Sequence, residues 1–192
     1  MAPLLSSEQL ERLCWLAARS IEAALSGQEG PVELPEDGRL HEPGASFVTL
    51  TRSGNLRGCI GSLQAWRPLW EDVWENARAA AFRDPRFPPL SAAEWRDVDV
   101  EVSVLTPPRP LPVSGEAELR QRLQPGKDGV ILSWRGHRAT FLPDVWAQLP
   151  DPAEFLAHLK RKAGLPEDFW APDMQVQIYG TQKAWLAAAN RT

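Results

Sequence analysis

The sequence predicts an α+β fold in which a mainly antiparallel sheet is flanked by helices, and three observations favour it. Two pairs of strand-like segments are each joined by a short turn containing glycine, which is typical of hairpins. A further segment, residues 97–105, places valine at every second position, as a half-buried strand does. Segments with helical spacing are clustered rather than alternating strictly with the strands, so a parallel βαβ sheet is not expected.

A short helix is expected where Ser91 and Glu94 form a capping box. Three longer helices are also expected, and each has a recognisable start. The first opens with a capping box, in which a serine is followed three residues later by glutamine. The second opens with a proline and two acidic residues, which suit the first turn of a helix. The third opens with Asp-Pro-Ala-Glu, which supplies a cap, a first-turn proline and an acid. These helices are predicted to run from Ser6 to Leu25, from Pro68 to about Phe82, and from Asp151 to Gly164.

Six strands are expected from alternating apolar and polar residues: 46–51, 56–63, 97–105, 129–134, 138–142 and 174–179. Short turns centred on Gly54 and Gly136 join the first pair and the fourth and fifth strands, so both pairs predict hairpins. In the strand 97–105 the valines share one face, while Asp99, Glu101 and Ser103 share the other.

The composition points to one folded domain and narrows the class of partner. Nine Trp and six Phe among 192 residues supply ample apolar area for a core. A net charge of −4 leaves no basic excess to neutralise phosphates, which argues against nucleic acid and anionic membranes as partners. The first residues lack the pattern of a signal peptide, and no apolar run approaches the ~20 residues that span a bilayer. A cytoplasmic location is therefore expected.

The common sequence signatures of cofactor and metal sites do not occur. There is no paired CxxC, no HExxH, no GxxxxGK[ST] and no GxGxxG. The three-cysteine cluster of an iron–sulfur radical enzyme is also missing. We therefore expect no metal and no cofactor. The three histidines are scattered along the chain, and each is interpreted as solvated or structural.

The segment Arg57-Gly58-Cys59-Ile60-Gly61 is the strongest candidate for a functional site. In a regular strand Arg57 and Cys59 lie on one face, and the flanking glycines leave the thiol without bulky neighbours. A guanidinium beside it would favour thiolate over thiol. Cys59 is thus a candidate nucleophile, with Arg57, Gly58 and Gly61 as candidate binding residues. The alternative is a bulged strand in which the cysteine fills a small gap.

Two other places could add to this site. The proline-rich loop with Asp84 and Arg86 can present a guanidinium to a carboxylate or phosphate. Alternatively this loop is a brace, in which Asp84 pairs locally and Phe87 fills the core. Glu101 is a second candidate catalytic residue; if its carboxylate is buried it needs a partner, and Arg57 could supply one.

Six motifs follow one another along the chain: Leu56-Arg57-Gly58-Cys59-Ile60-Gly61, Asp84-Pro85-Arg86-Phe87-Pro88-Pro89, Glu101-Val102-Ser103-Val104-Leu105, Asp128-Gly129, Phe141-Leu142-Pro143-Asp144-Val145-Trp146 and Lys162-Ala163-Gly164-Leu165. In this order they resemble the AMMECR-domain family, and within it the prokaryotic branch called AmmeMemoRadiSam system protein A. The resemblance implies a single AMMECR domain over residues 8–186, with tails at 1–7 and 187–192. It also implies an α+β fold with a larger sheet-bearing part and a smaller helical subdomain.

The resemblance further implies partners and signature positions, but no reaction. The partners would be a Memo-like protein and a radical SAM protein. The signature positions, matched residue by residue, are Arg57, Gly58, Cys59, Gly61, Asp84, Arg86 and Glu101.

Three functions follow as hypotheses, and whether the chain is an enzyme stays open. The first is a non-catalytic or substrate-presenting component that works with the two partners. The second is a thiol-dependent enzyme that uses Cys59 on a small anionic substrate. The third, between them, is a small-anion binder that uses Arg57 and Arg86.

Overall fold

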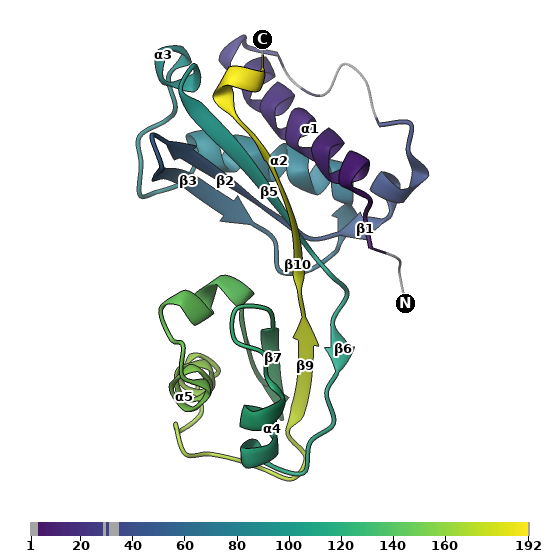
Figure 1. Cartoon of the computed structure of the whole chain (residues 1–192), viewed down its shortest axis with the longest axis vertical. Helices are drawn as coiled ribbons and strands as arrows, with labels where there is room; N and C mark the ends of the chain where they lie inside the picture. The colour runs from purple at the N-terminus through teal and green to yellow at the C-terminus, as the bar shows by residue number, and fades with distance from the viewer. Residues whose placement is uncertain (1–3, 29, 31–34, 192) are drawn as a thin grey trace. The chain divides into compact units, whose positions relative to one another are not determined.

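The computed structural model describes residues 4–28, 30 and 35–191, which form two compact units (Figure 1). The larger unit contains the described residues up to Leu105 together with the segment from Gln182 onward, and the smaller unit contains Thr106–Thr181. The α+β prediction is confirmed: antiparallel sheets are flanked by helices. A single domain over residues 8–186 stays a prediction.

The larger unit is built on a four-stranded sheet with the strand order β10-β5-β2-β3. β2 pairs antiparallel with both β3 and β5, so the predicted first hairpin is confirmed. β10 is an addition that the sequence did not predict. The strands are β2 (Ser46–Arg52), β3 (Asn55–Gly61), β5 (Val98–Leu105) and β10 (Thr181–Leu186).

Two helices cover one face of this sheet (Figure 1): α1 (Ser7–Leu25) and α2 (Leu69–Phe82). The α1 capping box between Ser6 and Gln9 is present as predicted. The four alternating valines of β5 are buried on this face with Val48 and Leu50 of β2. Burying such aliphatic side chains contributes roughly 1.5–3 kcal/mol each, so this layer holds the sheet against the helices. In the part of the chain that is described, both long helices of the larger unit pack on this one face and leave the opposite face uncovered.

Short elements complete the larger unit. A capping box of Ser91 and Glu94 starts a single helical turn. The two residues 43–44, which precede β2 in the sequence, pair antiparallel with residues 67–68, which precede α2. These elements are η1 (Gly38–His41), β1 (Pro43–Gly44), β4 (Arg67–Pro68), α3 (Ala92–Trp95) and η3 (Ala188–Asn190).

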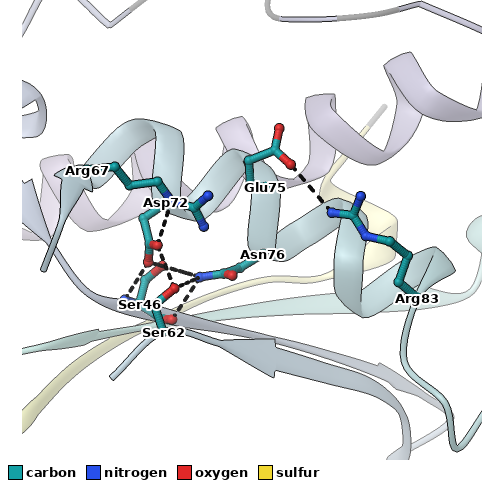
Figure 2. Close-up of polar contacts among 7 residues, drawn as sticks. All are labelled: Ser46, Ser62, Arg67, Asp72, Glu75, Asn76 and Arg83. Carbon is teal, nitrogen blue, oxygen red and sulfur yellow. Dashed lines mark hydrogen bonds and ion pairs between the residues drawn. The ribbon is translucent and has the colours of Figure 1, made fainter. Parts of the chain in front are cut away.

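A buried polar network ties α2 to the ends of β2 and β3 (Figure 2). The fully buried carboxylate of Asp72 accepts hydrogen bonds at one oxygen from the Ser46 backbone N–H (2.8 Å), the Ser46 hydroxyl (2.7 Å) and the Asn76 amide (2.9 Å). Its other oxygen accepts from the Ser62 hydroxyl (2.7 Å) and from Arg67 Nε (2.9 Å). A buried charge is tolerated only when it is paired and hydrogen-bonded, and all five donors meet that need. Periodicity alone did not reveal this network.

The smaller unit has its own sheet, with the strand order β6-β9-β7-β8 and antiparallel pairing throughout. The predicted second hairpin, β7 with β8, is confirmed. Trp146 stacks on Phe155 with ring centroids 3.7 Å apart at the centre of its core. Its elements are β6 (Arg109–Pro110), α4 (Glu116–Arg122), β7 (Gly129–Trp134), β8 (His137–Phe141), η2 (Pro143–Ala147), α5 (Pro152–Lys162) and β9 (Gln175–Tyr179).

Within the described residues, no helix combines the length and apolar character needed to cross a bilayer.

Candidate functional site

At both Gly58 and Gly61 an added Cβ would clash with a neighbouring group. An added Cβ at Gly58 would lie 2.1 Å from the backbone carbonyl oxygen of Ala80 on α2. An added Cβ at Gly61 would lie 2.2 Å from the ring of Phe47. Because Gly58 faces α2, the next residue, Cys59, faces the side of the sheet that α1 and α2 leave uncovered. Its side chain there is half-buried.

Arg57 does not share this face, because β3 contains a bulge. Leu50 of β2 pairs with Gly58, but the next β2 residue pairs with Leu56, so Arg57 is the extra residue. A bulge interrupts the alternation of side chains. The expectation from regular alternation that Arg57 and Cys59 share one face is therefore wrong, and the bulge that the alternative predicted is present.

Arg57 instead braces the loop and the short helix that follow α2. Its side chain is 9% exposed and bonds the carboxylate of Glu94 through Nε (3.0 Å) and Nη2 (3.2 Å). Nη2 also donates to the backbone carbonyl of Pro88 (2.9 Å). The hydrogen bonds from Arg57 lower the pKa of Glu94 to about 2. The carboxylate that Arg57 satisfies is thus Glu94 and not Glu101, which corrects the pairing expected from the sequence.

A row of polar side chains crosses the uncovered face of the sheet at the level of Cys59. Thr49 of β2 is the register partner of both Cys59 on β3 and Glu101 on β5. The Thr49 hydroxyl donates to Cys59 Sγ at 3.2 Å. One oxygen of Glu101 accepts from the Ser103 hydroxyl (3.1 Å) and pairs with Lys183 Nζ (3.5 Å) on β10. We call Cys59, Thr49, Glu101 and Lys183 the polar row.

The loop after α2 holds the backbone of Cys59 on the free edge of β3. The backbone N–H of Cys59 donates to Asp84 Oδ2 at 2.9 Å, and its carbonyl accepts from Arg86 Nη2 at 3.2 Å. Arg86 also donates to both carboxylate oxygens of Asp84, at 3.0 and 2.7 Å. These bonds from Arg86 hold the pKa of the buried Asp84 well below its usual range. The local pairing of Asp84 that the brace alternative predicted is therefore present, and it acts on Cys59 itself. The other part of that alternative is wrong, because Phe87 is only half-buried and is not among the described core residues.

The remaining thiol and the histidines lie elsewhere. Cys14 is 1% exposed on α1, and burial raises the pKa of its thiol to about 11. His41 lies in η1, where its Nε2 is 2.6 Å from the backbone carbonyl oxygen of Pro35. His137 and His158 belong to the smaller unit. In the part of the chain that is described, no hydrogen bond joins a histidine to Cys59.

The described residues contain no group of three or more His, Cys, Asp or Glu side chains placed to hold a metal ion. The structure brings together Cys59, Asp84 and Arg86 directly, and it brings Glu101 onto the same face through Thr49. Arg57 bonds Glu94 and the Pro88 carbonyl instead, and its guanidinium lies 5.7 Å from the centroid of the Phe87 ring, over which Arg86 also lies at 5.6 Å. Such an arrangement can hold a thiol at a fixed position on an open sheet face.

Sequence reasoning missed three members of this region. Thr49 could have been found by extending the hairpin register from the Gly54 turn, although the bulge displaces that register by one residue. Glu94 was seen only as a helix cap. No sequence pattern indicated Lys183, because the strand that contains it, β10, was not predicted.

The comparisons with known proteins agree with this fold. A model of the AMMECR1 family matches residues 14–184. A protein of Methanothermobacter thermautotrophicus is 41% identical over 186 residues, which cover 94% of this chain and 95% of that protein. Protein MK0488 of Methanopyrus kandleri is 37% identical over 187 residues, covering 95% of this chain and 90% of that protein. The crystal structure of the uncharacterized protein PH0010 from Pyrococcus horikoshii matches with a TM-score of 0.79 and 35% identity, over 94% of this chain and 93% of that one. This chain belongs to the AMMECR1 family.

Proposed function

We propose that the protein is a non-catalytic, substrate-presenting component that works in the cytoplasm with a Memo-like protein and a radical SAM protein. In this proposal the chain is a member of the AmmeMemoRadiSam branch of its family. The surface presented to these partners would be the uncovered face of the larger sheet. The observation that carries the proposal is that the polar row and an exposed tryptophan share this face.

The exposed tryptophan is Trp185 on β10. Ala184 and Leu186 of the same strand pack into the core, so alternation places Lys183 and Trp185 on the uncovered face. Trp185 is 65% exposed. Tryptophan is enriched among the residues that dominate binding energy in protein interfaces. An accessible indole beside a half-buried polar row therefore matches a docking surface better than a solvated sheet face.

The surroundings of Cys59 favour presentation over catalysis. An activated nucleophile needs an adjacent base or a lowered pKa that a neighbouring cation provides. The side chain bonded to the thiol is the neutral hydroxyl of Thr49. Arg57 is paired with Glu94, Arg86 is paired with Asp84, and the bonded oxygen of Glu101 is shared by Ser103 and Lys183.

The test is reconstitution of the three proteins. The chain, the Memo-like protein and the radical SAM protein from one genome would be co-expressed and purified through a tag on this chain. Binding of each partner would then be measured by calorimetry. We expect a complex, and we expect Trp185→Ala to weaken it by roughly 30-fold or more, as the loss of an anchor of about 2 kcal/mol implies.

The matched control is Trp15→Ala. Trp15 is 42% exposed on α1, which lies on the opposite side of the sheet. Its replacement should leave binding unchanged. If no complex forms and neither partner's activity changes in the presence of the chain, the proposal is wrong. Equal losses for the two tryptophan variants would place the docking surface elsewhere.

A second candidate function is a thiol-dependent enzyme or carrier that uses Cys59 on a small anionic substrate. The bond from Thr49 to the thiol and the half-exposed guanidinium of Arg86 favour it. A thermal-shift screen with phosphates, nucleotides and dicarboxylates tests the binding step. Stabilisation at millimolar ligand that Arg86→Gln abolishes would support this function, and no shift with any of them would count against it.

A further inference from the structure

We propose that the Asp84–Arg86 ion pair closes the free edge of β3 and prevents this strand from pairing with β3 of a second copy of the chain. The pair takes the place of a neighbouring strand, because it supplies one acceptor and one donor to the backbone of a single edge residue, Cys59. The edge is a different surface from the uncovered face of the sheet. Its role therefore goes beyond the proposed function and does not depend on it.

The edge position of β3 follows from the order of the larger sheet, in which β3 is the last strand after β2. Along an antiparallel pair, residues whose backbone groups bond the partner strand alternate with residues whose groups face away from it. The backbone N–H and carbonyl of Cys59 both bond side chains of the loop after α2, so they face away from β2. An edge residue with these two groups free is a template on which another chain can add a strand.

Asp84 and Arg86 reproduce the bonds that such an added strand would make. Asp84 Oδ2 accepts from the Cys59 N–H at 2.9 Å, in the place of a backbone carbonyl oxygen. Arg86 Nη2 donates to the Cys59 carbonyl at 3.2 Å, in the place of a backbone N–H. Arg86 also donates to both oxygens of Asp84, at 3.0 and 2.7 Å, so the acceptor and the donor hold each other. The two side chains therefore cap the edge as one unit.

The composition of β3 explains why its edge needs a cap. Three of its last four residues are small: Gly58, Cys59 and Gly61. Glycine-rich strands specify their register weakly and are prone to alternate pairing and domain swapping. β3 contains no proline, and its charged residue, Arg57, is turned inward with a side chain that is 9% exposed. The strand thus lacks the usual protection of an edge in its own sequence, and the loop supplies it.

A charged side chain also binds the free edge of the sheet in the smaller unit. There β8 is the last strand, and Lys162 Nζ donates to the backbone carbonyl of Thr140 at 3.0 Å. Lysine on an edge strand is one of the ways in which proteins avoid pairing between chains. The cap on β3 goes further, because it binds both backbone groups of one residue.

The strand that the cap excludes is β3 of a second copy. Two identical antiparallel edges can pair around a two-fold axis, because the same surface then serves both copies and no other protein is required. Such pairing would join two four-stranded sheets into one. In a purified sample the uncapped edge has this partner at the concentration of the chain itself, so the pairing depends on that concentration.

The experiment removes the cap with the double variant Asp84→Ala/Arg86→Ala. Analytical ultracentrifugation gives the weight-average mass of each protein from roughly 10 to 500 µM. Amide hydrogen exchange measured by NMR reports separately on the N–H of Cys59. Circular dichroism confirms that each variant is folded. If the double variant does not fold, Arg86→Ala is used in its place, because that side chain is 53% exposed and its loss frees the Cys59 carbonyl.

Two control variants separate uncapping from other effects. Arg83→Ala removes an arginine just before the capping pair, one that is 63% exposed and binds Glu75. Asp72→Asn disturbs the buried network between α2 and the sheet and leaves both bonds to Cys59 in place. Arg83→Ala controls for the loss of positive charge near the edge, and Asp72→Asn controls for the loss of stability.

We expect the mass of the double variant to rise with concentration toward twice that of the wild type, while both controls follow the wild type. In the dilute double variant the Cys59 amide should exchange roughly 10-fold or more faster than in the wild type, because its acceptor is gone. At the highest concentration this exchange should slow again, because the added strand provides a new acceptor. The single variant Arg86→Ala should associate in the same way but more weakly.

Three results would overturn the proposal. The first is a folded double variant that keeps the wild-type mass at every concentration although its Cys59 amide exchanges fast. The second is equal association of Asp72→Asn, which would make lost stability the cause. The third is association of the double variant while the Cys59 amide still exchanges fast, which would place the contact elsewhere. Each of these leaves the partner-binding test with Trp185→Ala unaffected, since Trp185 lies on β10.

Discussion

The substitution Asp72→Asn tests the buried network that joins α2 to the sheet. The variant keeps the shape of the side chain but removes its charge and one of its two acceptor oxygens. The remaining oxygen can still accept from Ser46 and Asn76, whereas the new amide faces the Ser62 hydroxyl and Arg67 Nε. The hydroxyl can turn and accept from the amide, but Arg67 cannot, because a guanidinium has no acceptor.

The expected loss of stability in Asp72→Asn follows from the bonds that the variant loses. Arg67 is 14% exposed on its side chain and loses its carboxylate at 2.9 Å. A hydrogen bond to a charged group contributes about 1.5–3 kcal/mol, and breaking a buried ion pair costs about 3–5 kcal/mol. We therefore expect the free energy of unfolding to fall by about 3–5 kcal/mol. With a typical denaturant slope of about 2 kcal/mol/M, the urea midpoint falls by roughly 1.5–2.5 M.

The matched control lies on the same helix. Glu75 pairs with Arg83 at 3.4 Å, but both side chains are exposed, at 40% and 63% (Figure 2). Glu75→Gln should change the free energy of unfolding by less than about 0.5 kcal/mol, because exposed ion pairs contribute little. Both variants would be followed by circular dichroism in urea. Equal effects of Asp72→Asn and Glu75→Gln would refute the reasoning, since the difference in burial is its basis.

Two further predictions concern the strand that carries the thiol. Gly58→Ala should destabilise the protein far more than Gly61→Ala, because its Cβ meets a backbone carbonyl at 2.1 Å, whereas the Cβ at Gly61 meets a side-chain ring that can move; equal melting temperatures for the two variants would contradict this. Glu94 has a depressed pKa in the folded state, about 2, so its contribution is fully present above its unfolded value of about 4.3 and is lost as the pH falls toward 2. Its side chain is 26% exposed, so the contribution is discounted to about 1–2 kcal/mol. Unfolding measured from pH 6 to pH 2 should show this loss in the wild type and not in Glu94→Gln, and parallel curves would count against the Arg57 brace.

The parts of the fold that the sequence predicted correctly are those with local signals. The capping boxes at Ser6 and Ser91 each involve residues three positions apart, and both are present. Both hairpins follow from short turns, each of two residues between the paired strand ends. The alternating valines of β5 revealed which face is buried, because a strand has a period of two.

The parts that the sequence did not predict depend on distant segments. β10 has only Ala184 and Leu186 alternating toward the core, which is too short a pattern to identify a strand. The bulge at Arg57 depends on the pairing of β2 with β3. It turns the arginine side chain away from the face of Cys59 and toward Glu94. The carboxylate of Asp72 accepts hydrogen bonds from residues 4 to 26 positions away along the chain, and no short motif predicts this combination.

The most direct test of the account compares the alkylation of Cys59 in the free chain and in the presence of saturating Memo-like or radical SAM protein. If the partners dock on the uncovered sheet face, their binding shields the thiol, and alkylation of Cys59 slows by roughly 10-fold or more, while buried Cys14 stays unreactive in both samples. A complex in which Cys59 reacts as fast as in the free chain would contradict the claim that this face is the one presented to the partners.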